Sequence, residues 1–121
     1  MKNLSKSIED YIETIYMIEQ EKGEIKSVDI ASKLGVSKPA VNKAMNELNK
    51  LNLIEKSNYS NILLTNEGRN FAKKIYDKHI LIYEFLISIG VSKKNANIDC
   101  CKIEHVISEE TAECMKKQIK K

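Results

Sequence analysis

The stretch SVDIASKLGVSKPAVNKAMNELNK, residues 27–50, places apolar side chains at helical spacing on both sides of Gly35. This spacing predicts a short helix at 27–34 and a second helix at about 38–51. A three-residue turn that contains a glycine, with Val36 pointing inward, lets two helices cross at a steep angle. The stretch therefore predicts a helix-turn-helix.

Two short β-like runs follow in LIEKSNYSNILLT, on either side of the polar residues Ser57–Asn61. Apolar runs around a polar cluster predict a small hairpin. A helix-turn-helix followed by a hairpin is the winged-helix layout. The sequence thus predicts a mainly α protein whose N-terminal part is a winged helix-turn-helix with a small β-hairpin wing.

Further helices are predicted before and after this layout. Residues 7–20 are amphipathic, and Ser7 stands in capping-box register with Asp10. Thr65 is the predicted N-cap of a long helix that runs to about Ile89 and is ended by the glycine that follows. A helix carrying Cys101, Glu104 and His105 and a last helix capped by Ser108 complete the predicted elements.

Length and composition limit the classes of protein that fit. The chain has 121 residues, a formal net charge of +3 and three cysteines, which allows one or two small domains. We expect domains at 1–70 and 71–121, the second holding the long linking helix and a helical dimerisation domain. There is no apolar run of about 20 residues and no signal-like N-terminus, so we expect a cytoplasmic protein with free thiols and no membrane partner.

The predicted wing and helix-turn-helix are locally basic. Residues 26–56 contain six lysines against three acidic residues. Small hydroxyl, amide and amine groups early in a recognition helix can reach base edges, and lysines pair with phosphate. The alternatives are an ordinary solvated helix face or a protein-interaction module. The predicted DNA contacts are Lys26, Ser37, Lys38, Pro39, Ala40, Asn42, Lys43 and Asn46.

A second cluster of polar residues lies near the C-terminus. Cys101, Glu104 and His105 fall at i, i+3 and i+4, so on a helix they share one face, and each can ligate a divalent metal once deprotonated. Three ligands are too few alone. Taken singly, His79 reads as a hydrogen-bonded core histidine, Asp10 with its neighbour Glu13 as a solvated acidic face, and Cys101 as a small buried apolar residue.

Over nearly its whole length the chain resembles the iron- and manganese-responsive metalloregulators typified by the diphtheria toxin repressor and the manganese transport regulator. The matching segments are EDYIETIY, DIASKLGVSKPAV, LTNEGR, the pair Lys78–His79, and CKIEHVIS. The resemblance implies one metal-ligand set drawn from three helices. Its members are Asp10, Glu13, His79, Cys101, Glu104 and His105.

The implied ligand set is a hybrid of two family types. Asp10 matches the manganese type, where the iron type has methionine, and Cys101 matches the iron type, where the manganese type has glutamate. A thiolate favours Fe(II), Co(II), Ni(II) or Zn(II), and carboxylates suit Mn(II); we expect Fe(II) narrowly over Mn(II). Tyr83 and Asn97 stand where an ancillary site would be completed and are poorer ligands.

The resemblance implies a homodimeric repressor that binds a palindromic operator in double-stranded DNA, with Fe(II) or Mn(II) as co-repressor. The resemblance also implies that the protein has no small organic substrate and is not an enzyme. One alternative is a winged-helix regulator that senses an iron–sulfur cluster held by Cys100, Cys101 and Cys114. A small zinc hydrolase is another, although the sequence has neither an H-E-x-x-H motif nor a glycine-rich loop.

Overall fold

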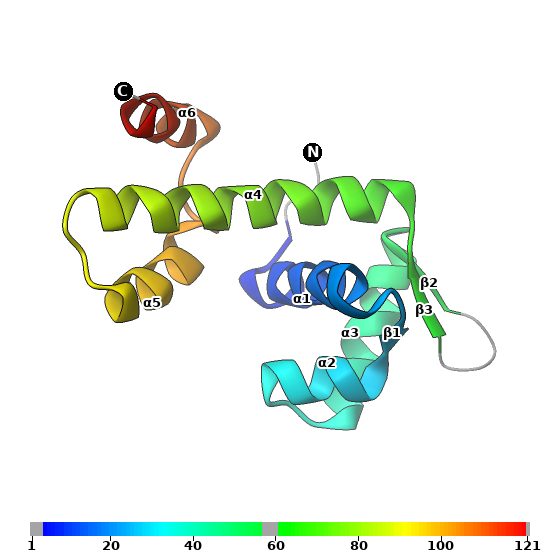
Figure 1. The fold of residues 1–121 in the computed structure, drawn as a ribbon. Helices are drawn as coiled ribbons and strands as arrows, with labels where there is room; N and C mark the ends of the chain where they lie inside the picture. The colour runs from blue at the N-terminus through cyan, green and yellow to red at the C-terminus, as the bar shows by residue number, and fades with distance from the viewer. Residues whose placement is uncertain (1–3, 57–60, 121) are drawn as a thin grey trace. The chain divides into compact units, whose positions relative to one another are not determined.

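The computed structural model describes residues 4–56 and 61–120 (Figure 1). In chain order the elements are α1 (Lys6–Lys22), β1 (Ile25–Lys26), α2 (Ser27–Leu34), α3 (Lys38–Lys50), β2 (Ile54–Lys56), β3 (Asn61–Leu64), α4 (Asn66–Ser88), α5 (Lys93–Ile103) and α6 (Glu109–Ile119). The chain divides between Lys73 and Lys74 into two compact units, the N-terminal unit and the C-terminal unit. The mainly α fold with a small sheet agrees with the fold class predicted from the sequence.

Helix α1 begins earlier than the sequence predicted. The side chain of Ser5, not Ser7, is the N-cap and accepts a hydrogen bond from the backbone N–H of Ile8 at 3.3 Å. The capping-box prediction is therefore wrong, because Ile8 already belongs to the buried stripe in the first turn. Gly23 ends the helix at φ 74°, a left-handed conformation that glycine adopts readily.

The helix-turn-helix forms as predicted from α2 and α3. Its turn is fixed by the backbone: Gly35 has φ 65°, and the N–H of Val36 donates to the carbonyl of Ala31 at 3.1 Å. Val36 is 36% exposed, so the prediction that it points inward is wrong. The fully buried side chains of Ile30 and Met45 fill the core of the motif instead.

The wing is part of a three-stranded antiparallel sheet with the order β1-β3-β2. Strands β2 and β3 pair Ile54 with Leu64, and both side chains are buried. Most of the predicted turn at Ser57–Asn61 lies outside the described residues. Strand β1 was not predicted from the sequence; it pairs Ile25 with Ile62 on the other edge of β3.

The C-terminal unit consists of most of α4 together with α5 and α6. Ile82 of α4 and Ala96 and Cys100 of α5 have no exposed surface. Serines cap the two later helices: Ser92 accepts from the N–H of Asn95, and Ser108 accepts from that of Thr111. None of the helices in the described part of the chain combines the length and the hydropathy that a membrane crossing needs.

Helix α5 ends at Ile103, so the prediction that Glu104 and His105 lie on the helix with Cys101 is wrong. Glu104 is the C-cap residue. The N–H of His105 donates to Lys102 at 3.4 Å and that of Val106 to Ile103 at 3.0 Å, three residues back instead of four. This tighter turn takes the chain out of the helix toward the cap of α6.

Candidate metal centre and nucleic-acid interface

His79 of α4 and Glu104 at the end of α5 meet inside the C-terminal unit. The Nδ1 atom of His79 lies 3.3 Å from Oε2 and 3.4 Å from Oε1 of Glu104. The Glu104 side chain is 1% exposed, and its Oε2 accepts no hydrogen bond from any described residue. A buried carboxylate oxygen without a donor costs roughly 1–3 kcal/mol or more, so this oxygen fits a position beside a cation.

His105 lies on the other side of the same carboxylate. Its Nε2 atom is 3.6 Å from Oε1 of Glu104, and its side chain is 3% exposed. The tight turn after Ile103, rather than a shared helix face, places these two side chains together. Glu104 is therefore flanked by two imidazoles, His79 and His105, within one unit.

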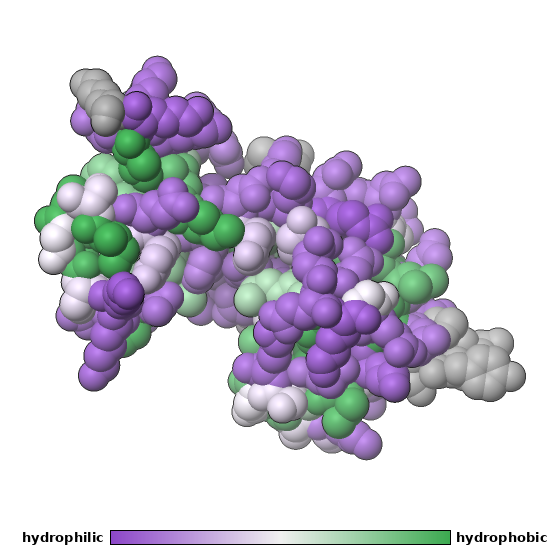
Figure 2. Space-filling view, viewed as in Figure 1, coloured by the Kyte–Doolittle hydropathy of each residue, from purple (hydrophilic) through white to green (hydrophobic). Residues whose placement is uncertain are grey.

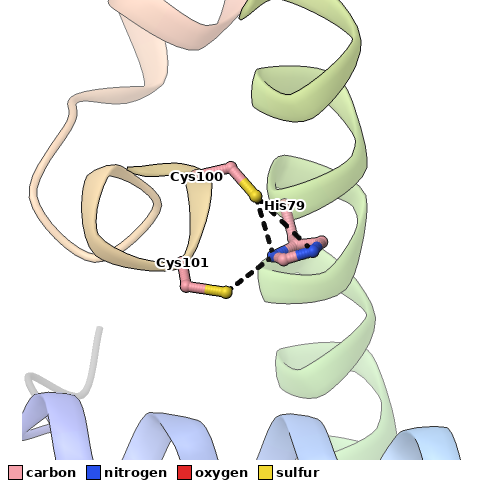
Figure 3. A group of neighbouring side chains, drawn as sticks. All are labelled: His79, Cys100 and Cys101. Carbon is pink, nitrogen blue, oxygen red and sulfur yellow. Dashed lines mark hydrogen bonds between the residues drawn. The ribbon is translucent and has the colours of Figure 1, made fainter. Parts of the chain in front are cut away.

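Two cysteines of α5 project toward His79, as Figure 3 shows. The Cys101 sulfur lies 3.9 Å from Nδ1, and the Cys100 sulfur lies 3.6 Å from both ring nitrogens. Cys101 is exposed and Cys100 is buried. Four of the six predicted ligands, His79, Cys101, Glu104 and His105, therefore gather around this part of the C-terminal unit.

The predicted metal-ligand set left out Cys100, which was named only in the iron–sulfur alternative, because the set took only the face that Cys101 would share with Glu104 and His105. A usable signal was present: Ala96 and Cys100 are four residues apart, the spacing of a buried helix face, and both are fully buried. Cys114 is exposed on α6 and does not join Cys100 and Cys101 in a group of metal-ligand atoms among the described residues. Among the described residues, the iron–sulfur alternative therefore lacks its third cysteine ligand.

The remaining predicted ligands, Asp10 and Glu13, lie one turn apart on α1 in the N-terminal unit. Glu13 is 7% exposed, and Asp10 is half-buried with an oxygen 3.0 Å from Nζ of Lys6. Neither residue is fully solvated, in contrast to the solvated acidic face that was the ordinary interpretation. Carboxylates, imidazoles and thiols together make a donor set suited to a divalent transition metal.

The predicted DNA contacts lie on and beside α3. Ser37 is its N-cap and accepts from the N–H of Ala40 at 3.3 Å. Asn46 accepts a hydrogen bond from Lys56 of β2 at 2.7 Å. The exposed positions are Lys38, Pro39, Asn42, Lys43 and Asn46; Ala40 is half-buried and Lys26 is exposed on β1. The opposite side of α3 is core, so the helix presents a polar, basic face outward.

Both parts of the chain match one family. Residues 3–62 match the N-terminal DNA binding domain of the iron dependent repressors, and residues 65–121 match their metal binding and dimerisation domain. The chain is 38% identical over 109 residues to the transcriptional regulator MntR of Escherichia coli O157:H7, covering 90% of this chain and 70% of that protein. It is 38% identical over 115 residues to an uncharacterized HTH-type transcriptional regulator of Methanocaldococcus jannaschii, covering 93% and 92%.

Solved structures of transcriptional regulators are also similar to this chain. The manganese regulator SloR has a TM-score of 0.82 at 30% identity, over 93% of this chain and 53% of that one. The metal-dependent transcriptional regulator MtsR has a TM-score of 0.86 at 27% identity, over 97% and 55%. The chain therefore spans about half the length of these solved chains.

Proposed function

The chain belongs to the iron-dependent repressor family of transcriptional regulators, and from this premise we propose that it is a DNA-binding repressor with Fe(II) or Mn(II) as co-repressor, controlling genes of metal uptake and homeostasis. The observation that carries the proposal is the buried Glu104 carboxylate, whose Oε2 lacks a hydrogen-bond donor among the described residues and lies 3.3 Å from His79. A bound divalent cation would place a positive charge beside this buried carboxylate and stabilise its ionised form. We propose no catalytic residue.

The proposed ligand set has members in both units. His79, Cys101, Glu104 and His105 would hold the co-repressor ion from the C-terminal unit. Asp10 and Glu13 of α1 would bind the same ion. Carboxylates of the N-terminal unit and side chains of the C-terminal unit would then bind one ion. The bound ion would restrict the movement of the DNA-reading N-terminal unit.

The donor types suit both proposed ions. The Cys101 thiolate favours Fe(II) over Mn(II) and also admits Zn(II), Co(II) or Ni(II) in vitro, whereas the carboxylates of Asp10, Glu13 and Glu104 suit Mn(II). Solved relatives point to comparable ions: SloR is described as a manganese regulator, and ScaR as bound to Zn²⁺. Fe(II) is our narrow preference because of the thiolate.

For DNA we propose that α3 lies in the major groove of a palindromic operator. Ser37, Lys38, Pro39, Ala40, Asn42, Lys43 and Asn46 would face bases and phosphates, and Lys26 of β1 the backbone. Reading both half-sites requires two copies whose recognition helices stand about 34 Å apart. Since operator DNA is the partner, the proposed location is the cytoplasm.

The second copy is proposed to dock on apolar surface of the C-terminal unit. Figure 2 shows apolar side chains gathered over the end of α4 and over α5. Ile87 is 37% exposed, Ile89 61% and Ile98 46%. Exposed apolar patches of this kind mark association sites, and this part of the chain matches the dimerisation domain of the family.

The metal-dependent step is tested by fluorescence anisotropy with a duplex selected from a random-sequence pool in the presence of protein and Mn²⁺. We expect operator affinity to rise with Mn²⁺ and with anaerobic Fe²⁺ and to fall with chelator. Glu104→Gln should abolish this response, while the unfolding free energy of the metal-free protein stays within about 1 kcal/mol because the side-chain volume is kept. Operator affinity that stays constant through full titrations of both ions would refute the proposal.

The dimer is tested by sedimentation equilibrium. Ile89→Lys should shift the protein toward monomer, because an ammonium group would be buried in the interface. Leu63→Lys is the matched control, since Leu63 is 55% exposed on β3 of the N-terminal unit. If both variants kept the mass of the wild type, the proposed surface would be wrong.

A further inference from the structure

His79, Cys100 and Cys101 form a group of potential metal ligands that needs no residue of the N-terminal unit. One ligand atom from each residue lies within 4.8 Å of the other two. Figure 3 shows the two sulfur atoms projecting from α5 on the side of that helix that packs against α4 at His79. Cys100 has no part in the proposed co-repressor set, so its position requires a separate explanation.

The distances agree with the edges of a tetrahedral metal site. Bond lengths of about 2.3 Å for Zn–S and about 2.0–2.1 Å for Zn–N put a sulfur and a nitrogen ligand about 3.5 Å apart. The sulfurs of Cys100 and Cys101 lie 3.6 Å and 3.9 Å from Nδ1 of His79. The Glu104 carboxylate lies 3.3 Å from the same nitrogen and could complete the set.

One side-chain rotation separates this arrangement from a coordinating one. Because the Cys100 sulfur is 3.6 Å from both ring nitrogens, it lies over the face of the imidazole, whereas a metal binds Nδ1 in the ring plane. Coordination through Nδ1 would therefore require the imidazole to turn about the Cβ–Cγ bond of His79, which is a broad torsion in histidine. As a thiol, Cys100 donates to the carbonyl of Asn97 at 3.4 Å.

We infer that His79, Cys100 and Cys101 form a thiolate-rich site for a soft divalent cation, Zn(II) in the first instance, lying wholly within the C-terminal unit. Two thiolates and an imidazole form a ligand set that binds Zn(II) more strongly than Mn(II). On binding, each thiol releases its proton and both sulfurs bind as thiolates. Asp10 and Glu13 are not required, so this site is filled independently of the N-terminal unit.

The test reads the number of thiolates on the metal, with full-length protein and without DNA. Co²⁺ is added anaerobically, and the thiolate-to-cobalt charge-transfer absorption, which grows with the number of thiolates bound, is measured. We expect a two-thiolate band in the wild type, about half of it in Cys100→Ser and in Cys101→Ser, and the full band in Cys114→Ser. Competition with a chromophoric chelator should show Zn²⁺ binding at least about tenfold weaker in Cys100→Ala, since loss of an outer-shell partner alone typically costs 10–100-fold.

X-ray absorption of the Zn²⁺-loaded wild type and of Cys114→Ser avoids any dependence on how variants of the buried Cys100 fold. Two sulfur neighbours at about 2.3 Å are expected in both. A single sulfur neighbour, or a cobalt band that Cys100→Ser leaves at full strength, would overturn the inference and leave Cys100 as a buried apolar residue.

The inferred site shares His79 and Cys101 with the proposed co-repressor set, but failure of the one proposal can be told apart from failure of the other. Asp10→Ala combined with Glu13→Ala removes co-repressor ligands but none of the three residues, so its cobalt band should match that of the wild type. Loss of the band in that double variant would refute a site confined to the C-terminal unit. Failure of the repressor proposal would instead appear as operator binding that ignores Mn²⁺ and Fe²⁺.

Discussion

Gly68 lies in the first turn of α4, where a Cβ atom would overlap the carbonyl oxygen of Leu53. The same segment is tied to the end of the α3–β2 connection: the N–H of Thr65 donates to Leu53 at 3.1 Å, and its hydroxyl donates to the carbonyl of Asn52 at 2.8 Å. The hydroxyl of Thr65 also accepts from the N–H of Gly68 at 2.9 Å. The absent side chain thus allows α4 to start against the backbone of the N-terminal unit.

We expect Gly68→Ala to lower the free energy of unfolding by about 1–3 kcal/mol, the usual cost of overpacking. In an unhindered helix the same change would stabilise by about 0.8–1.0 kcal/mol, so the sign of the effect is diagnostic. Urea denaturation measures it, with Asn70→Ala on the exposed side of the same helix as the control. A stabilising Gly68→Ala would mean that the close approach to Leu53 does not exist in solution.

Single residues were predictable from the sequence where their neighbours in space are also neighbours in the chain. Thr65 as the cap of α4 and Ser108 as the cap of α6 needed only local pattern, and both predictions are confirmed. The contact of Cys100 with His79 could not be predicted in this way. It depends on which face of α5 packs against α4, and the two residues in contact are 21 positions apart in the sequence.

At the scale of elements, Arg69 at the start of α4 forms a salt bridge with Glu19 of α1. Its Nε donates to Oε1 at 3.0 Å and one terminal nitrogen donates to Oε2 at 2.8 Å. Hydrogen bonding to Glu19 raises the pKa of the guanidinium, while desolvation acts in the opposite direction. A two-point contact of this geometry resists sliding of one helix along the other.

We expect a coupling energy of about 0.2–1 kcal/mol between Arg69 and Glu19, because the pair is partly exposed and solvent screens it. A double-mutant cycle with Arg69→Lys and Glu19→Gln, read as free energies of unfolding, measures the coupling. Repeating the cycle in 1 M salt should reduce it, since the Debye length falls to about 3 Å. A coupling of zero at low salt would show that the two-point geometry contributes nothing.

Helix α3 carries its own prediction, which concerns Lys43. If this exposed lysine contacts a phosphate, Lys43→Ala should weaken binding to all duplexes alike and reduce the slope of log affinity against log salt by about 0.9. Lys33→Ala is the control, since Lys33 on α2 pairs with Glu21 at 3.0 Å and is outside the predicted contact set. An unchanged salt slope for Lys43→Ala would remove this residue from the interface.

Helices were the elements that the sequence predicted best, because an apolar repeat of 3.6 residues over three or more turns is hard to mistake. Helices α2 and α3 lie within a residue of the predicted bounds. Strand β1 has only two residues and exists through pairing with β3, some 37 residues later in the chain (Ile25 with Ile62). No local pattern encodes such a strand. The early end of α5 was also missed, since Glu104 and His105 continue the helical spacing although the chain turns away.

For the whole molecule, the resemblance to iron- and manganese-responsive regulators predicted the family and the fold, and the family matches over both units confirm both. The choice between Fe(II) and Mn(II) could not be predicted in the same way. The candidate ligands mix hard carboxylates with a thiolate at Cys101, and adjacent Cys100 adds a second thiol beside His79. Ligand type therefore supports only a narrow preference for Fe(II), which rests on the thiolate.

The proposed co-repression links two binding events, and linkage requires them to be reciprocal. If Mn²⁺ raises operator affinity by some factor, the operator must raise Mn²⁺ affinity by the same factor; typical couplings of about 1–3 kcal/mol correspond to about 5–150-fold. Calorimetric titration of Mn²⁺ into free and operator-bound protein gives one factor, and anisotropy with and without Mn²⁺ gives the other.

The carboxylates of α1 decide whether this coupling passes through the proposed ligands. Asp10→Ala combined with Glu13→Ala should bring both factors close to one, because the ligands of the C-terminal unit would then bind the ion without engaging the DNA-reading unit. Glu9→Ala removes a carboxylate from the same helix without touching the proposed set, and it should keep the coupling of the wild type. If the double variant kept the full coupling, the ion would act through other residues, and the assignment of Asp10 and Glu13 would have to be abandoned.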